Sequence, residues 1–178
     1  KTLPTGAFLM MGAGKFPDTR TTRPRDQEMW VMKADAKTPP IPLNHKISEG
    51  VAISARQMKI AWSNTSGQYP DQLASGESVI YTADIIYKDG VPALANKKEL
   101  MRARAPECTL EAQDFRNNDT ELIYTCYRSP YADVLGYDLN TGRNATYRKL
   151  PNEYNEVEGI YPDGKYTLVE SSRDQGPD

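Results

Sequence analysis

The sequence predicts an all-β fold made of repeated four-stranded antiparallel sheets. Three segments share one pattern, in which a tight turn leads into an apolar strand and then into a polar exit: residues 52–64, 112–128 and 161–173. The 13 prolines and 12 glycines are spread along the chain, as expected where turns separate many short strands. No long amphipathic helix is visible; residues 97–104 contain helix-forming side chains, but the segment is short and has no apolar face.

The turns have the residue types that hairpins require. In the last copy, Pro162 presets φ at the first central position, and the following Asp-Gly pair tolerates left-handed backbone conformations. In the middle copy an Asn-Asn pair has the same tolerance. The first copy has a looser turn. The two less regular turns lie at residues 54–57 and 116–119.

The spacing of the copies indicates a repeat architecture. The apolar strands begin near Met58, Leu122 and Tyr166, which gives steps of 64 and 44 residues. The second step matches the roughly 40–45 residues of one four-stranded propeller blade. A second set of apolar strands, each ending in Asp, fills the intervals at residues 28–35, 78–84 and 132–138. The order strand, turn, strand, loop, strand, turn, strand therefore repeats about three times.

This combination of a Pro-Asp-Gly-Lys turn, an apolar strand, a Ser-Arg exit and a strand ending in Asp resembles the TolB-type, WD-like β-propeller repeat of bacterial periplasmic and secreted proteins. The resemblance implies one β-propeller segment with blades near residues 1–50, 51–106, 107–153 and 154–178, the last incomplete. In this context residues 97–104 become the outer strand of a blade. Closed propellers have four to eight blades. We therefore expect further blades from the same polypeptide or, less readily, from another chain.

The two cysteines bear on the compartment. Cys108 and Cys126 are equidistant from Asn117, so a symmetric hairpin places them opposite each other, within reach of a disulfide. A disulfide indicates an oxidising, periplasmic or extracellular location, in agreement with the resembling family. The alternative is two reduced thiols in the core. Three Asn-x-Ser/Thr sequons at predicted turns are possible glycosylation sites: Asn64, Asn118 and Asn144.

The sequence offers little for catalysis. Its single histidine, His45, lies in a predicted surface loop, so a metal centre or a Ser-His-Asp triad has few candidates. No Gly-x-Ser-x-Gly elbow or complete phosphate loop occurs. We expect no catalytic residue, cofactor or metal within this chain. A net charge of −2 with mixed signs argues against nucleic-acid binding, and no apolar run is long enough to span a membrane.

Carboxylates on the predicted inner strands are the strongest binding candidates. Glu111 and Asp114 occupy the same part of their repeat as Glu156 and Glu158 do in the next. Such acids would line a propeller channel and hold a cation or basic ligand, or they would pair with arginines of adjacent blades. Two tyrosines are candidate aromatic contacts at the rim: Tyr131 and Tyr161. The alternative role for the tyrosines is packing between blades.

Two classes of function follow from these observations. The first is a non-enzymatic secreted or periplasmic propeller that binds a protein or glycan. The second is the propeller portion of a larger enzyme, either a peptidase or a polysaccharide lyase, whose catalytic residues lie outside this chain. Propellers with this repeat serve as binding modules, substrate-gating domains and lyases, so the fold alone does not choose between these classes.

Overall fold

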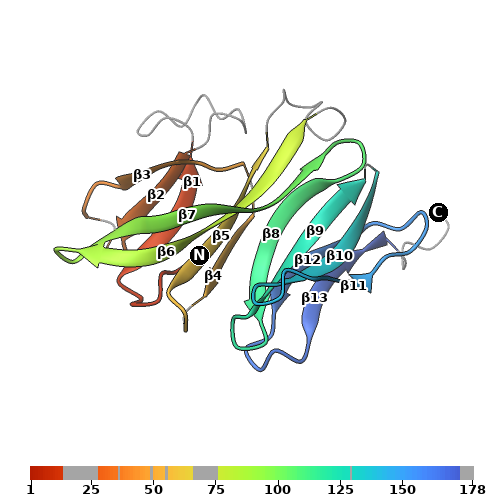
Figure 1. Ribbon diagram of the computed structural model, residues 1–178. Coiled ribbons are helices and arrows are strands. Elements are labelled where there is room, and N and C mark those ends of the chain that lie inside the picture. Colours follow the sequence, from red (N-terminus) through yellow and green to blue (C-terminus); the bar gives the residue numbers. More distant parts are fainter. Residues whose placement is uncertain are drawn as a thin grey trace.

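The computed structural model describes residues 1–13, 28–35, 37–48, 50–54, 56–65, 76–128 and 130–172 of the 178-residue chain. Within these ranges the secondary structure consists of strands β1 to β13, without an α-helix (Figure 1). The predicted all-β fold class is confirmed. Arg173, which ends the last repeat copy, lies outside the described residues. No helix in the described ranges has the length and apolar character to cross a membrane.

The described strands form four antiparallel sheets that follow one another along the chain (Figure 1). The first sheet contains β1 (Phe8–Ala13), β2 (Glu28–Lys33) and β3 (Ile41–Lys46). The second contains β4 (Val51–Ser54), β5 (Lys59–Thr65), β6 (Glu77–Lys88) and β7 (Val91–Arg104). The third contains β8 (Thr109–Arg116), β9 (Glu121–Arg128), β10 (Tyr131–Asp138) and β11 (Asn144–Arg148). The fourth contains β12 (Asn155–Ile160) and β13 (Thr167–Ser171).

The predicted repeat strands take equivalent places in successive sheets. β5, β9 and β13, which contain the apolar segments of the three copies, are each the second strand of a different sheet. The segment at residues 97–104 belongs to β7, the outer strand of the second sheet, as expected. β6 and β7 also continue as a pair past the end of β5, and the Tyr87 hydroxyl lies 3.1 Å from Thr5 Oγ1 near the first sheet.

Apolar side chains fill the spaces between neighbouring sheets. Trp62 is fully buried in a cluster formed by the first and second sheets, together with residues such as Phe8, Met29 and Ile85. A second cluster lies between the second and third sheets, and a third, around Val157, lies between the third and fourth. The sheets therefore stack face to face, because burial of these side chains removes apolar surface from water.

A hydroxyl group on the second strand of one sheet accepts a hydrogen bond from the first strand of the next sheet. The Ala112 N–H donates to Ser63 Oγ at 2.7 Å, and the Val157 N–H donates to Thr125 Oγ1 at 3.3 Å. These bonds satisfy backbone donors on strand edges that have no neighbouring strand. Because the same bond recurs at equivalent positions, it contributes to the regular stacking of the sheets.

The turn between β8 and β9 contains three consecutive residues in the left-handed region. Asn117, Asn118 and Asp119 have φ values of 53°, 56° and 64°. Asn and Asp tolerate this conformation better than other residues with a side chain, so the prediction of a turn here was sound. In the turn between β12 and β13, Gly164 has φ of 72°, and its N–H donates to the Tyr161 carbonyl at 2.8 Å.

The expectations for His45 and for the cysteine register were wrong. His45 lies in β3 rather than in a loop, and its half-buried ring is 5.4 Å from that of Trp62. The symmetric register proposed for the cysteines also fails, because Cys126 is paired with Leu110 in the β8–β9 ladder. A bulge between Ala112 and Asp114 and the position of the turn shift the register.

The disulfide nevertheless forms. Cys108 lies just before β8, its Cα is 5.3 Å from that of Cys126, and the two sulfur atoms are bonded. The bridge closes a sequence separation of 18 residues across the β8–β9 hairpin. It is consistent with an oxidising compartment.

Candidate functional site

The first strands of successive sheets lie next to one another, so their side chains can meet. β8 contacts β4 on one side and β12 on the other. All three run from the start of their sheet toward a turn, and the carboxylates singled out in the sequence lie on β8 and β12. The candidate site is therefore built where the third sheet packs against the fourth.

The Tyr127 hydroxyl joins carboxylates from two sheets. It lies 2.5 Å from Glu111 Oε2 on β8 and also contacts Glu156 Oε1 on β12. A phenol hydroxyl has one hydrogen, so both contacts are hydrogen bonds only when one of the carboxyl groups holds a proton. Glu111 is buried, with 8% of its surface exposed, so this contact lies largely out of water.

Glu156 has two further neighbours. Tyr154 contacts Glu156 Oε2 through its hydroxyl, and the Gln113 side-chain amide donates to Glu156 Oε1 at 3.4 Å. Burial, followed by the neighbouring Glu111, raises the pKa of Tyr127, and burial, followed by Glu156, raises the pKa of Tyr154. Both phenols therefore remain neutral hydrogen-bond donors at physiological pH.

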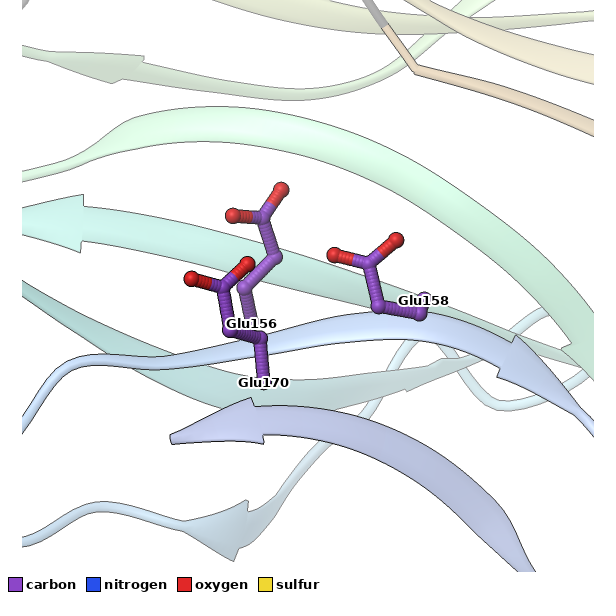
Figure 2. A group of neighbouring side chains, drawn as sticks. All are labelled: Glu156, Glu158 and Glu170. Atoms are coloured by element: carbon purple, nitrogen blue, oxygen red, sulfur yellow. The ribbon is translucent and has the colours of Figure 1, made fainter. Parts of the chain in front are cut away.

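Three carboxylates gather on the last sheet, as Figure 2 shows: Glu156, Glu158 and Glu170. One oxygen of each lies within 4.8 Å of the others. Glu156 and Glu170 are paired directly across β12 and β13, a placement that is unfavourable for two like charges. An all-oxygen set of this kind suits a hard cation such as calcium. Tyr154 offsets part of the repulsion by donating a hydrogen bond to Glu156, and the Tyr127 hydroxyl contacts the same carboxylate.

Asp114 connects the same two inner strands farther along β8. Its carboxylate accepts the Phe115 N–H at 3.0 Å and the β12 Ile160 N–H at 3.3 Å. Lys1 Nζ lies 3.9 Å from the same carboxylate. Asp114 therefore holds β12 against β8 at the end near the turns.

An open groove of about 410 Å³ lies beyond Asp114, where the turns of three sheets come together. Its apolar lining includes Ile53, Phe115 and Ile160, and Tyr161 stands beside it with 56% of its surface exposed. The charged and polar lining comes mainly from three turns and comprises Arg56, Asp114, Arg116, Asn117, Asn118, Asp119 and Asp163.

The predicted site residues do not form one site in the structure, but lie at separate positions. Glu111 and Glu156 meet at Tyr127, and the exposed Glu158 lies beside Glu156. Asp114 and Tyr161 instead line the groove. Tyr131 begins β10, the third strand of its sheet, and is paired with Arg128 there.

The sequons also lie in different settings. Asn118 is an exposed turn residue. Asn64 lies within β5 and is half-buried, so its predicted turn is wrong. Asn144 is the exposed first residue of β11, and its side-chain oxygen accepts the Tyr124 hydroxyl at 3.0 Å. Glycosylation of these residues stays a prediction.

Sequence reasoning missed several residues of the site. Tyr127, Tyr154 and Gln113 were not singled out, because their contacts depend on how two sheets pack. Glu170 could have been found, since it and Glu156 are equidistant from Asp163, the centre of the predicted turn. For Arg56 the sequence predicts a place in a turn and no binding role.

Comparison with known proteins places this fold among β-propellers. No protein-family model matches the chain, and no curated protein matches its sequence. The crystal structure of puromycin hydrolase matches with a TM-score of 0.55 and 15% identity, covering 88% of this chain and 23% of that one. A structure from an analysis of two prolyl endopeptidases matches with a TM-score of 0.51 and 11% identity, covering 94% and 25%.

Both similar structures are propeller proteins, so the stacked sheets described here are propeller blades. The chain spans about a quarter of the length of these structures. At such low identity the likeness shows the fold, and it assigns no residue a role.

Proposed function

We propose that this chain belongs to the β-propeller of a larger peptidase-type hydrolase, whose catalytic residues lie outside residues 1–178. The observation that carries the proposal is the match of nearly the whole chain to about a quarter of a puromycin hydrolase and a prolyl endopeptidase. The proposed role is to admit and orient substrate rather than to cleave it. This corresponds to one of the two functions that the sequence left open.

The inner strands support a role in ligand contact. Glu158 and Glu170 are exposed beside the half-buried Glu156 on the last sheet, and they would favour a basic group of a ligand. The disulfide supports a periplasmic or extracellular location for the larger protein. The TolB-like character of the repeat remains part of this proposal.

The proposal is tested by comparing two proteins: the full polypeptide that contains this segment, and the 178-residue chain alone. Each is incubated with fluorogenic peptide amides, and release of the fluorophore is measured. We expect hydrolysis by the full polypeptide and none by the isolated chain. Hydrolysis by the isolated chain would place the chemistry in these blades and overturn the proposal.

A second candidate, the non-enzymatic binding propeller, is favoured by the groove, which offers charged and aromatic groups at one end of the blades. It is distinguished by the same experiment. A full polypeptide that binds peptide or glycan without cleaving peptide or amide substrates would support this candidate instead.

A further inference from the structure

Among the described residues, the guanidinium of Arg56 in the groove at the blade turns has no carboxylate partner. Arg56 is exposed, and its guanidinium donates to the neutral side-chain oxygen of Asn118. Among the described residues, no carboxylate lies within ion-pair distance of Arg56. By contrast, Arg116, which also lines the groove, is paired with Glu121 at 3.0 Å. A guanidinium has five N–H donors, so Arg56 retains donors for another molecule.

The acids of the groove are already engaged in holding the turns. Asp119 Oδ2 accepts the Ser54 hydroxyl at 2.8 Å and the Arg56 backbone N–H at 3.1 Å. Asp163 accepts the Lys165 N–H at 3.0 Å, and Asp114 accepts the two N–H groups described above. These carboxylates therefore have local structural roles, and the Arg56 guanidinium retains N–H donors that an anionic ligand could use.

Hydrogen bonds to the turn of the next sheet position Arg56 in the groove. Its backbone is tied to Asp119, and its side chain is tied to Asn118, both in the left-handed turn of the next sheet. Contacts between the turns of two sheets thus position the guanidinium. A cation held in place loses little conformational freedom on binding, which favours affinity.

The rest of the groove suits an apolar group adjacent to the anion. Ile53, Phe115 and Ile160 contribute apolar lining, and the largely exposed ring of Tyr161 stands next to them. The Tyr161 ring is supported edge-on by Tyr166, with centroids 6.1 Å apart. A ligand that joins a carboxylate to an apolar side chain would use both parts of the groove.

We propose that this groove binds a peptide through a carboxylate held by Arg56, with an apolar or aromatic side chain of the peptide against Tyr161. Arg matches a carboxylate in a planar, two-bond geometry that a lysine ammonium does not reproduce. The inference deepens the proposed function by naming the ligand group. It is tested by binding alone, so absence of hydrolysis by the larger polypeptide would not affect its outcome.

The test uses fluorescence anisotropy with N-terminally labelled hexapeptide pools that end in Phe, Leu or Tyr. One pool has a free terminal carboxylate, and a second is amidated. A third pool is amidated and contains an internal Glu. It distinguishes binding of a terminal carboxylate from binding of an acidic side chain. A labelled galacturonate oligosaccharide tests an acidic glycan. We expect at least one of the two carboxylate-bearing peptide pools to bind. The amidated pool without the internal Glu should bind markedly more weakly.

Variants then assign the contact. Arg56→Gln should weaken binding about 10- to 100-fold, the range for loss of a hydrogen bond to a charged group. Arg56→Lys should bind with intermediate affinity, because it keeps the charge but loses the planar geometry. Tyr161→Ala should weaken binding about 3- to 10-fold. The control, Arg143→Gln, removes an exposed arginine outside the groove lining and should bind like the native chain.

Thermal melting separates loss of contact from loss of fold. Because Arg56 and Tyr161 are exposed, their variants should melt close to the native chain. Equal binding of the amidated and carboxylate pools, native affinity of Arg56→Gln, or no peptide binding at millimolar concentration would each overturn the proposal. Binding of the galacturonate alone would replace the peptide with an acidic glycan and would also overturn it.

Discussion

Replacing Tyr127 with phenylalanine removes one hydroxyl group from the contact between the third and fourth sheets. In the native protein this hydroxyl lies 2.5 Å from Glu111 Oε2 and also contacts Glu156. Because Glu111 is only 8% exposed, water replaces the lost donor poorly. A hydrogen bond to a charged group contributes about 1.5–3 kcal/mol, so we expect a loss of about 2 kcal/mol in unfolding free energy. For a chain of 178 residues this lowers Tm by about 4–8 °C.

The same variant should alter the dependence of stability on pH. Burial and Glu111 raise the pKa of Tyr127 in the folded state, whereas the unfolded tyrosine titrates near pH 10. A raised folded pKa gives stability that is present below pH 10 and is lost as pH rises above that value. Between pH 10 and 11 the unfolding free energy of the native chain should therefore fall by about 1 kcal/mol more than that of Tyr127→Phe. The difference between the two proteins should shrink in that window.

The measurement is urea unfolding, followed by circular dichroism from pH 7 to pH 11. Tyr166→Phe serves as the control, because it removes a hydroxyl from a residue that is 66% exposed, and it should change stability by less than about 0.5 kcal/mol. If Tyr127→Phe matches this control at pH 7, or if its deficit stays constant up to pH 11, the hydroxyl does not bridge the two sheets.

Three further predictions concern two glycines with positive φ, the carboxylates of the last sheet and the disulfide. Gly50→Ala should lower the unfolding free energy by at least about 2 kcal/mol, because Gly50 has φ of +70° and a Cβ there would lie 2.5 Å from the Ala112 carbonyl oxygen. Gly90→Ala, with φ of +77° and open space around it, should cost only about 1 kcal/mol, and equal losses would refute the steric argument. Glu156→Gln should cost about 1 kcal/mol in urea unfolding, since the amide replaces one acceptor with a donor, whereas the exposed Glu158→Gln should leave Tm nearly unchanged. Alkylation of the denatured, non-reduced chain should modify neither cysteine, and reduction should cost about 3 kcal/mol; two free thiols would exclude the disulfide.

Local features of the fold could be predicted because they depend on neighbouring residues. The Pro-Asp-Gly turn and the Asn-Asn-Asp turn were placed correctly, since the backbone conformations they adopt are open to few residue types. The apolar strands after these turns were also correct, because their side chains must be buried whichever sheet covers them. The position of His45 was less accessible to local reasoning, since a strand that contains Pro42 and Asn44 resembles a loop.

Residue patterns along the chain establish that this protein is all-β, that its strands recur in sheet-sized units, and that a hairpin brings its two cysteines within reach of each other. Which side chains meet across sheets depends instead on how the sheets pack. The bulge after Ala112 alters the register on β8, and the stacking of the sheets then places Glu111 and Glu156 on one tyrosine hydroxyl. It likewise sets Arg56 against the turn of the next sheet. Such contacts join residues distant along the chain, so they depend on the twist and spacing of packed sheets, which local turn chemistry does not fix.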